Sequence, residues 1–200
     1  ATSGQFANAP VDVIVAACTG ASYLIGAERE RAIVDLVQAA RGVPFLTAAL
    51  AAVAALRARD AKRIALLSPY PETLNAASAP YWRSHGFDIV AVAGPQPRTD
   101  RFHPIYAVQS DMVLQTYREL SDAGADAVLM LGTGMPTLRP ILQGADEGLT
   151  PAVSCNLALV WAAVQKKPWT DLAEGSIADW CRGVHWRERL DTLFPLPAGA

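Results

Sequence analysis

The chain has 200 residues, of which 52% are hydrophobic, and a formal net charge of -2. This length allows one large or two small domains with a substantial hydrophobic core. The 17 basic residues form no run longer than Lys166-Lys167, so we expect no binding to nucleic acid or to an anionic membrane surface.

Other compositional signals favour an ordinary cytoplasmic protein. No apolar run reaches the roughly 18 to 20 residues that a bilayer-spanning helix needs, and residues 1–10 lack the features of a signal peptide. Three cysteines without CxxC spacing argue against a disulfide framework and against a structural zinc site. The three histidines are scattered, so we expect no metal site.

Strands and helices are predicted to alternate along the chain. The continuous apolar run Val11–Ala17 predicts a strand buried on both faces, and the spacing of Ile33, Leu36 and Val37 predicts a helix over 27–40. The further strands are predicted at 44–47, 63–68, 87–93, 127–131 and 151–154. The further helices are predicted at 48–59, 72–85, 106–123 and 156–165, with a short helix or a turn at 137–144.

This alternation is typical of parallel α/β architecture, in which ligands bind at the carboxyl ends of the strands. Cys18, Tyr70 and Gly132 fall at such ends. Two segments can each be interpreted in two ways. The Pro-rich loop 94–104 is either a lid or a surface connection, and the Trp-rich amphipathic tail 177–193 either forms an interface or caps the first domain.

An internal repeat links two parts of the chain. An aspartate, an apolar run and a Thr-Gly pair occur at 12–20 and again at 126–134, with Cys18 replaced by Gly132 in the second copy. A proline-led strand that runs into a helix is repeated at 44–53 and 151–160. We interpret the pattern as an internal duplication with one active half.

The first copy carries the strongest candidate for chemistry. Backbone N–H groups at a strand end would favour the thiolate of Cys18 and make it a nucleophile or an acid, whereas the alternative is a small buried hydrophobe. The two Thr-Gly pairs supply hydroxyl and N–H donors for a carboxylate, or are simply tight turns. Tyr70 either donates to an oxyanion or packs a loop, and we interpret Cys155 and Cys181 as core residues.

Four motifs resemble those of the aspartate/glutamate racemase superfamily. Within this superfamily, they are most similar to the branch that contains the maleate cis-trans isomerases and the arylmalonate decarboxylases. The resemblance covers about Val11 to Trp169. Its motifs are Ala17–Ser22, Leu67–Tyr70 with Asn75, Leu131–Gly134 with Thr137-Leu138, and Val153–Asn156 with Ala158 and Trp161.

The resemblance implies two pseudo-symmetric parallel-sheet α/β domains with the active site in the cleft between them, and neither a metal nor an organic cofactor. We expect residues 1–47 plus 152–200 to form the first half-domain, which bears Cys18, and residues 48–151 to form the second. Members of the family begin with another strand and helix ahead of Val11, so the first domain is expected to lack its N-terminal strand.

The resemblance also assigns roles to residues. It implies Cys18 and Tyr70 as catalytic residues. The implied substrate-binding residues are Thr19, Gly20, Ser22, Gly132, Thr133, Gly134 and Asn156. Position 132 is where the second cysteine of the family stands, and its replacement by glycine argues against racemisation with two bases.

These expectations lead to one main hypothesis and two alternatives. The main hypothesis is a cofactor-independent isomerase that acts through Cys18 on a small dicarboxylate such as maleate, through an enediolate. The alternatives are an arylmalonate-type decarboxylase with Cys18 as proton donor and a non-catalytic carboxylate-binding relative. The expected partner is a small mono- or dicarboxylate, and homo-oligomer formation is left open.

Overall fold

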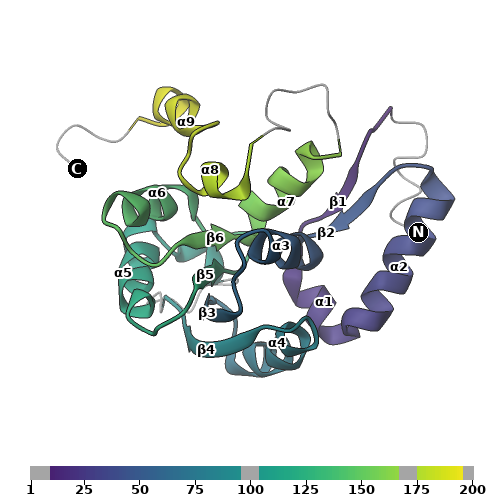
Figure 1. Cartoon of the computed structure of the whole chain (residues 1–200), viewed down its shortest axis with the longest axis horizontal. Coiled ribbons are helices and arrows are strands. Elements are labelled where there is room, and N and C mark those ends of the chain that lie inside the picture. The colour runs from purple at the N-terminus through teal and green to yellow at the C-terminus, as the bar shows by residue number, and fades with distance from the viewer. Residues whose placement is uncertain (1–9, 96–103, 167–174, 196–200) are drawn as a thin grey trace.

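The computed structural model describes residues 10–95, 104–166 and 175–195, in which strands and helices alternate as predicted (Figure 1). The strands are β1 (Ile14–Ala16), β2 (Phe45–Thr47), β3 (Arg63–Leu67), β4 (Asp88–Ala93), β5 (Ala127–Met130) and β6 (Ala152–Ser154). The helices are α1 (Thr19–Ile25), α2 (Ala27–Arg41), α3 (Ala48–Arg57), α4 (Glu72–Ser84), the 3-10 helix η2 (Pro104–Ala107), α5 (Ser110–Ser121), α6 (Leu138–Asp146), α7 (Cys155–Val164), α8 (Ile177–Cys181) and α9 (Arg187–Leu193).

The strands form two parallel sheets, which confirms the predicted α/β class. One sheet pairs β1 with β2, and the other has the order β4-β3-β5-β6. Strand β3 lies between β4 and β5. The chain after β3 therefore forms β4 on one side of β3 and then crosses over to form β5 on the other side. The carboxyl ends of β3 and β5 therefore flank a topological switch point, where parallel α/β sheets bind their ligands.

The internal repeat is visible in the strand pairing. Strand β1 pairs with β2 in the register Ile14 to Phe45, and β5 pairs with β6 in the register Val128 to Ala152. In each pair the first N–H donates to the carbonyl of the proline that leads the partner strand, at 2.9 Å in both cases. The two halves are therefore equivalent residue by residue along these strands.

The equivalence extends to the helices that follow. Thr47 and Ser154 cap α3 and α7, each accepting a hydrogen bond from the backbone N–H three residues later. The two helices pack against each other at the centre of the molecule (Figure 1). Small residues on α3, including the fully buried Ala48 and Ala52, allow this close approach.

The strand pairing corrects one part of the predicted domain division. Residues 152–154 were assigned to the first half-domain, but β6 hydrogen-bonds to β5 and completes the four-stranded sheet. The rest of the division stays a prediction.

The first sheet also differs from the prediction of a fully buried strand. Val15, at the centre of β1, is 45% exposed because, within the described residues, β1 pairs only with β2. Helix α2 follows the predicted boundaries, but Ile33 and Leu36 on its apolar side are exposed, and its one buried residue is Glu30.

One predicted helix is broken in the structure, and the amphipathic tail forms two short helices. The helix expected over 106–123 is divided into η2 and α5, because Gln109 is extended (φ -99°, ψ 160°) and starts a new helix. The tail is divided into α8 and α9 near Gly183, whose positive φ of 75° a helix interior does not accept. The predicted loop at 94–104 lies largely outside the described residues.

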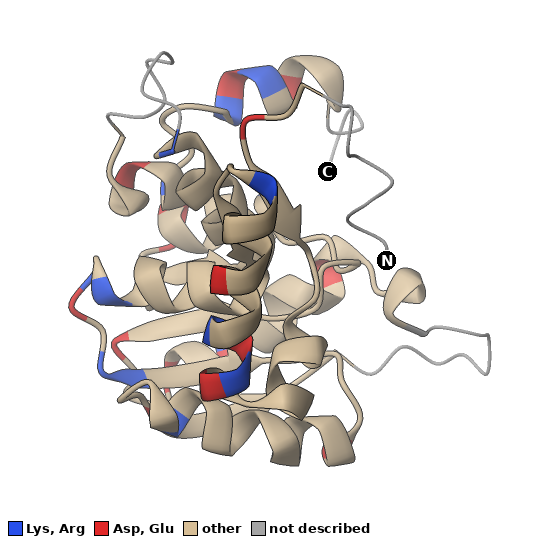
Figure 2. Ribbon diagram, turned by 90° about the vertical axis from the view of Figure 1, so that its right-hand side faces the viewer, with Lys and Arg blue, Asp and Glu red and all other residues tan. Residues whose placement is uncertain are grey.

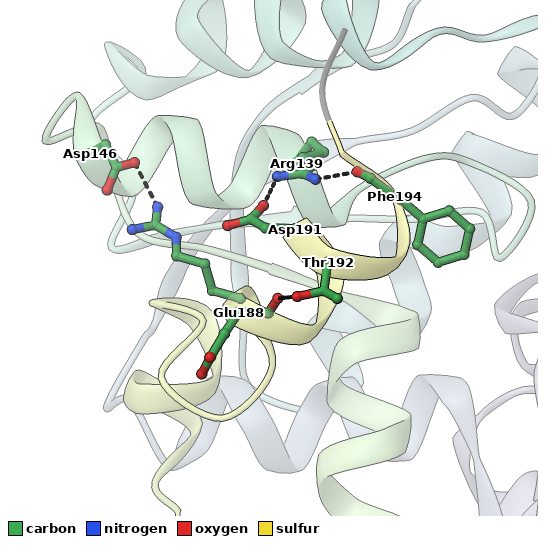
Figure 3. A network of polar contacts seen from close by, with 7 residues as sticks. Arg139, Asp146, Glu188, Asp191, Thr192 and Phe194 are labelled. Carbon is green, nitrogen blue, oxygen red and sulfur yellow. Dashed lines mark hydrogen bonds and ion pairs between the residues drawn. The ribbon is translucent and has the colours of Figure 1, made fainter. Parts of the chain in front are cut away.

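The tail packs against the second half of the chain. Helix α8 contacts α6 and α7. Helix α9 is tied to α6 by Arg139, which donates to Asp191 and to the Phe194 carbonyl, and by Arg187, which donates to Asp146 (Figure 3). Such exposed ion pairs contribute little stability individually.

Acidic and basic residues are interspersed over the helices and turns (Figure 2). Every helix in the described ranges is too short or too polar to cross a membrane.

Candidate active site

Cys18 follows β1 directly and is exposed. It is the N-cap residue of α1, with an extended backbone (φ -151°, ψ 105°), so the chain turns into the helix at the residue after the thiol. The predicted position at the carboxyl end of a strand is therefore correct.

A pair of hydroxyl groups lies beside this thiol. The Thr19 Oγ1 and the Tyr70 hydroxyl are 2.8 Å apart, although Thr19 follows a strand of one sheet and Tyr70 follows a strand of the other. Burial raises the pKa of Tyr70, with a smaller opposing effect from Thr19, so the phenol remains a proton donor at neutral pH. The loop that carries Tyr70 is fixed by Asn75, whose side-chain amide donates to the Tyr70 carbonyl at 2.9 Å.

The Gly132–Gly134 turn connects the two halves. The Thr133 hydroxyl donates to the carbonyl of Ala17 at 3.0 Å, and the Asn156 amide donates to the carbonyl of Thr133 at 2.9 Å. Thr133 and Asn156 thus hold the second Thr-Gly turn against the residue that precedes Cys18. These contacts position the turn, and they occupy polar groups that were predicted to bind substrate.

Glycine is required in this turn for steric reasons. Gly132 has φ +82°, and a Cβ there would lie 2.5 Å from Cγ of Pro69. A Cβ on Gly134 would lie 2.8 Å from the ring of Tyr106. The segment around η2 therefore covers the glycine turn closely.

Two predicted binding residues have other surroundings. The Ser22 side chain is buried and its hydroxyl donates to Glu30 at 2.5 Å, so it is directed to the interior of the protein and not to Cys18. Gly20 is buried where a Cβ would lie 3.3 Å from Leu74 of α4, which gives it a packing function.

A buried polar cluster behind α1 was not predicted. Glu30 is 1% exposed and accepts hydrogen bonds from Ser22 and from the Tyr81 hydroxyl, both at 2.5 Å. The rings of Tyr23 and Trp82 pack around Tyr81. The cluster joins α1, α2 and α4, and no sequence pattern distinguishes Glu30 from the exposed acidic residues of its helix.

Cys155 was predicted to be a core residue, and it is 1% exposed. Burial raises the pKa of its thiol to about 12, so the thiol keeps its proton at neutral pH. The assignment of Cys155 to the core is therefore confirmed.

A cavity of about 460 Å³ lies beside this site. Among the predicted site residues, Asn156 lines it and Cys18 does not. Its walls are mainly apolar and come from α6 to α9 and the turn before α6, including Met135, Leu157 and Trp180. In the described ranges, no group of three or more His, Cys, Asp or Glu side chains is arranged to hold a metal ion.

The family model of arylmalonate decarboxylase matches residues 1–177. The chain therefore belongs to the arylmalonate decarboxylase family, and the resemblance to this branch of the superfamily is confirmed. None of the curated protein sequences compared matches the chain.

Solved structures show the same fold. An arylmalonate decarboxylase superposes with a TM-score of 0.74 at 21% identity, covering 83% of this chain and 73% of the other. A cysteine-to-serine variant of Nocardia farcinica maleate cis-trans isomerase with a covalently bound succinylcysteine intermediate gives 0.71 at 24% identity, covering 81% and 68%. A cysteine-to-alanine variant of Pseudomonas putida maleate isomerase with maleate gives 0.70 at 22% identity, covering 80% and 66%.

Proposed function

We propose that the protein is a cofactor-independent cis-trans isomerase of a small unsaturated dicarboxylate such as maleate, with Cys18 as the nucleophile. The observation that carries the proposal is the exposed Cys18 thiol at a strand end, next to the hydrogen-bonded pair Thr19 and Tyr70. The thiol can meet a small molecule from solvent, and a protonated phenol lies ready to stabilise developing negative charge.

The reaction follows from these groups. The Cys18 thiolate adds to one alkene carbon, and the π electrons move into the neighbouring carboxylate to form an enediolate. Tyr70 and the N–H groups of the glycine turn stabilise the new charge, and one such donor contributes about 3 to 4 kcal/mol. The former double bond rotates, and the enediolate expels the thiolate to give fumarate.

Incubation of the purified protein with maleate tests the proposal. We expect fumarate to form without release of CO2, and a succinyl adduct to be detected on Cys18 after rapid quenching. Cys18→Ala should abolish turnover, whereas Cys181→Ala, which alters a buried cysteine on α8, should retain it. Full activity of Cys18→Ala would contradict the proposal.

The family match supports a second candidate, an arylmalonate-type decarboxylase. In that reaction the same donors stabilise the enediolate left by the loss of CO2, and Cys18 protonates it. Formation of a chiral monoacid from a prochiral arylmalonate, with no conversion of maleate, would favour this candidate. Thermal stabilisation by dicarboxylates without any turnover would instead indicate a carboxylate-binding protein.

A further inference from the structure

The helix that starts after the proposed nucleophile is held at two points on one face. Thr19 and Ser22 are three residues apart in α1, so their side chains lie on the same side of the helix, about one turn apart. At the first point, Thr19 is hydrogen-bonded to the Tyr70 hydroxyl. At the second, the Ser22 hydroxyl donates to Glu30 at 2.5 Å. One contact in the site and one contact behind it therefore fix the rotation of α1 about its axis.

Glu30 also holds the helix that follows the Tyr70 loop. Helix α4 begins at Glu72, and its Tyr81 hydroxyl donates to the second carboxylate oxygen of Glu30 at 2.5 Å. Burial raises the pKa of Tyr81, and the bond to Glu30 adds to this effect, so the phenol is the donor in that bond. One carboxylate thus binds α1 and α4, the two helices that start just after Cys18 and Tyr70.

Packed aromatic rings fill the space between these contacts. The ring of Tyr23 lies edge-on to that of Tyr70, with centroids 6.4 Å apart, and it also packs against Tyr81 at 5.4 Å. Protein interiors are dense enough to transmit small displacements. A movement of α1 against α4 at Glu30 would therefore change the distance between the hydroxyls of Thr19 and Tyr70.

The second copy of the internal repeat differs at this position. Ser22 stands two residues after Gly20, whereas proline, Pro136, stands two residues after Gly134 and offers no hydroxyl. A buried carboxylate also costs free energy that an apolar side chain would not. The copy that carries the exposed thiol is the one with the serine and the buried carboxylate, which favours a role in the site over a role in the fold that both copies share.

We propose that Glu30 is a positioning residue for this site: its carboxylate fixes α1 against α4 and thereby keeps the Thr19 and Tyr70 hydroxyls in contact. This inference rests on the proposed function. Glu30 takes no part in the bond changes of the reaction, because it is 1% exposed and each of its oxygens accepts a hydrogen bond from a buried hydroxyl. It acts on the rate only through the orientation of the Tyr70 proton donor.

Ser22→Ala and Tyr81→Phe each remove one of the two contacts with little loss of packed volume. We expect each to lower kcat on maleate roughly 10 to 100-fold, because a misplaced catalytic group costs rate even when the replaced residue lies away from the reacting atoms. KM should change little, since the donor acts on charge that develops in the transition state. Tyr117→Phe removes a hydrogen bond to the Thr150 carbonyl on the other side of the molecule and should keep wild-type turnover as the matched control. Unchanged kcat in both test variants would overturn the inference.

Two comparisons separate positioning from other effects. In a Tyr70→Phe background, Ser22→Ala should lower kcat no further, because the donor that it positions is already absent, and additive losses would contradict the inference. Glu30→Gln keeps a side chain that can bind both hydroxyls, so it should retain most of the turnover that Glu30→Ala loses. Equal losses in these two variants would assign the effect to the negative charge and would also rule out positioning.

A measurement without substrate distinguishes failure of this inference from failure of the proposed function. In NMR spectra of protein with isotope-labelled tyrosine, the Tyr70 signal is identified by its loss in Tyr70→Phe. We expect this signal to shift in Ser22→Ala and to stay in place in Tyr117→Phe. If the wild-type protein converts no maleate but the signal shifts, the proposed function fails while the positioning of Tyr70 by Glu30 stands. If maleate is converted and the signal does not move, the inference alone fails.

Discussion

Tyr70 is the residue whose hydroxyl we expect to contribute most to charge stabilisation. Tyr70→Phe should lower kcat roughly 10² to 10³-fold, the usual effect of the loss of one oxyanion donor, with little change in stability. Steady-state kinetics on maleate measure this effect. Tyr117→Phe is the control, because the Tyr117 hydroxyl donates to the carbonyl of Thr150 and to no residue of the proposed site. Equal losses in the two variants would contradict the assignment.

Gly132 allows a test of backbone strain at a single residue. Gly132→Ala should destabilise the protein by about 1 to 3 kcal/mol, because it adds a collision with Pro69 to an unfavourable positive φ. Gly148→Ala is the control, since Gly148 has a similar φ of +72° but nothing within 4 Å of the added Cβ. Urea unfolding of both variants measures the difference. The explanation is wrong if the two changes cost the same free energy.

At the scale of elements, the buried carboxylate of Glu30 joins α1, α2 and α4. Glu30→Ala leaves the hydroxyls of Ser22 and Tyr81 buried without their acceptor, which should cost on the order of 3 kcal/mol. Glu28→Ala, an exposed change on the same helix, should cost less than about 0.5 kcal/mol. Thermal or urea unfolding of the two variants measures these losses of stability. The prediction is contradicted if Glu30→Ala lowers the free energy of unfolding no more than Glu28→Ala does.

The helices and strands also show where sequence patterns were sufficient to predict secondary structure. Five of the predicted strands, from β2 to β6, match the structure within one or two residues, because buried apolar runs between Gly, Pro and charged residues are strong signals. Strand β1 is shorter than its apolar run and partly exposed, since burial depends on how many strands pair with it. The break at Gln109 could not be predicted, because local propensity does not report that η2 packs on the glycine turn.

For the site, the repeat in the sequence located the turns but not the directions of side chains. Thr19, the residue after Cys18, meets Tyr70 because strand ends determine where these residues lie. Ser22 is directed towards Glu30, a contact that depends on how α1 and α2 fold back on each other. Cys155 was assigned to the core because its neighbours in sequence are apolar, and its 1% exposure confirms the assignment.

At the scale of the whole molecule, the two equivalent strand pairs should differ in stability. The N–H groups of Ile14 and Val128 make the same hydrogen bond, each to a proline carbonyl at 2.9 Å. Strand β5 lies between β3 and β6 and is fully buried, whereas β1 pairs only with β2 within the described residues and is partly exposed. Separation of β1 from β2 therefore exposes less apolar surface than separation of β5 from β6, and it should require less free energy.

Hydrogen exchange measured by NMR tests this difference at matched positions. After correction for intrinsic rates, we expect the Ile14 amide to exchange on the order of 100-fold faster than the Val128 amide, which corresponds to about 3 kcal/mol. Because the two hydrogen bonds have the same length and the same kind of acceptor, the ratio reports the packing around them. Equal protection of the two amides would show that the two-stranded sheet opens only together with the rest of the fold.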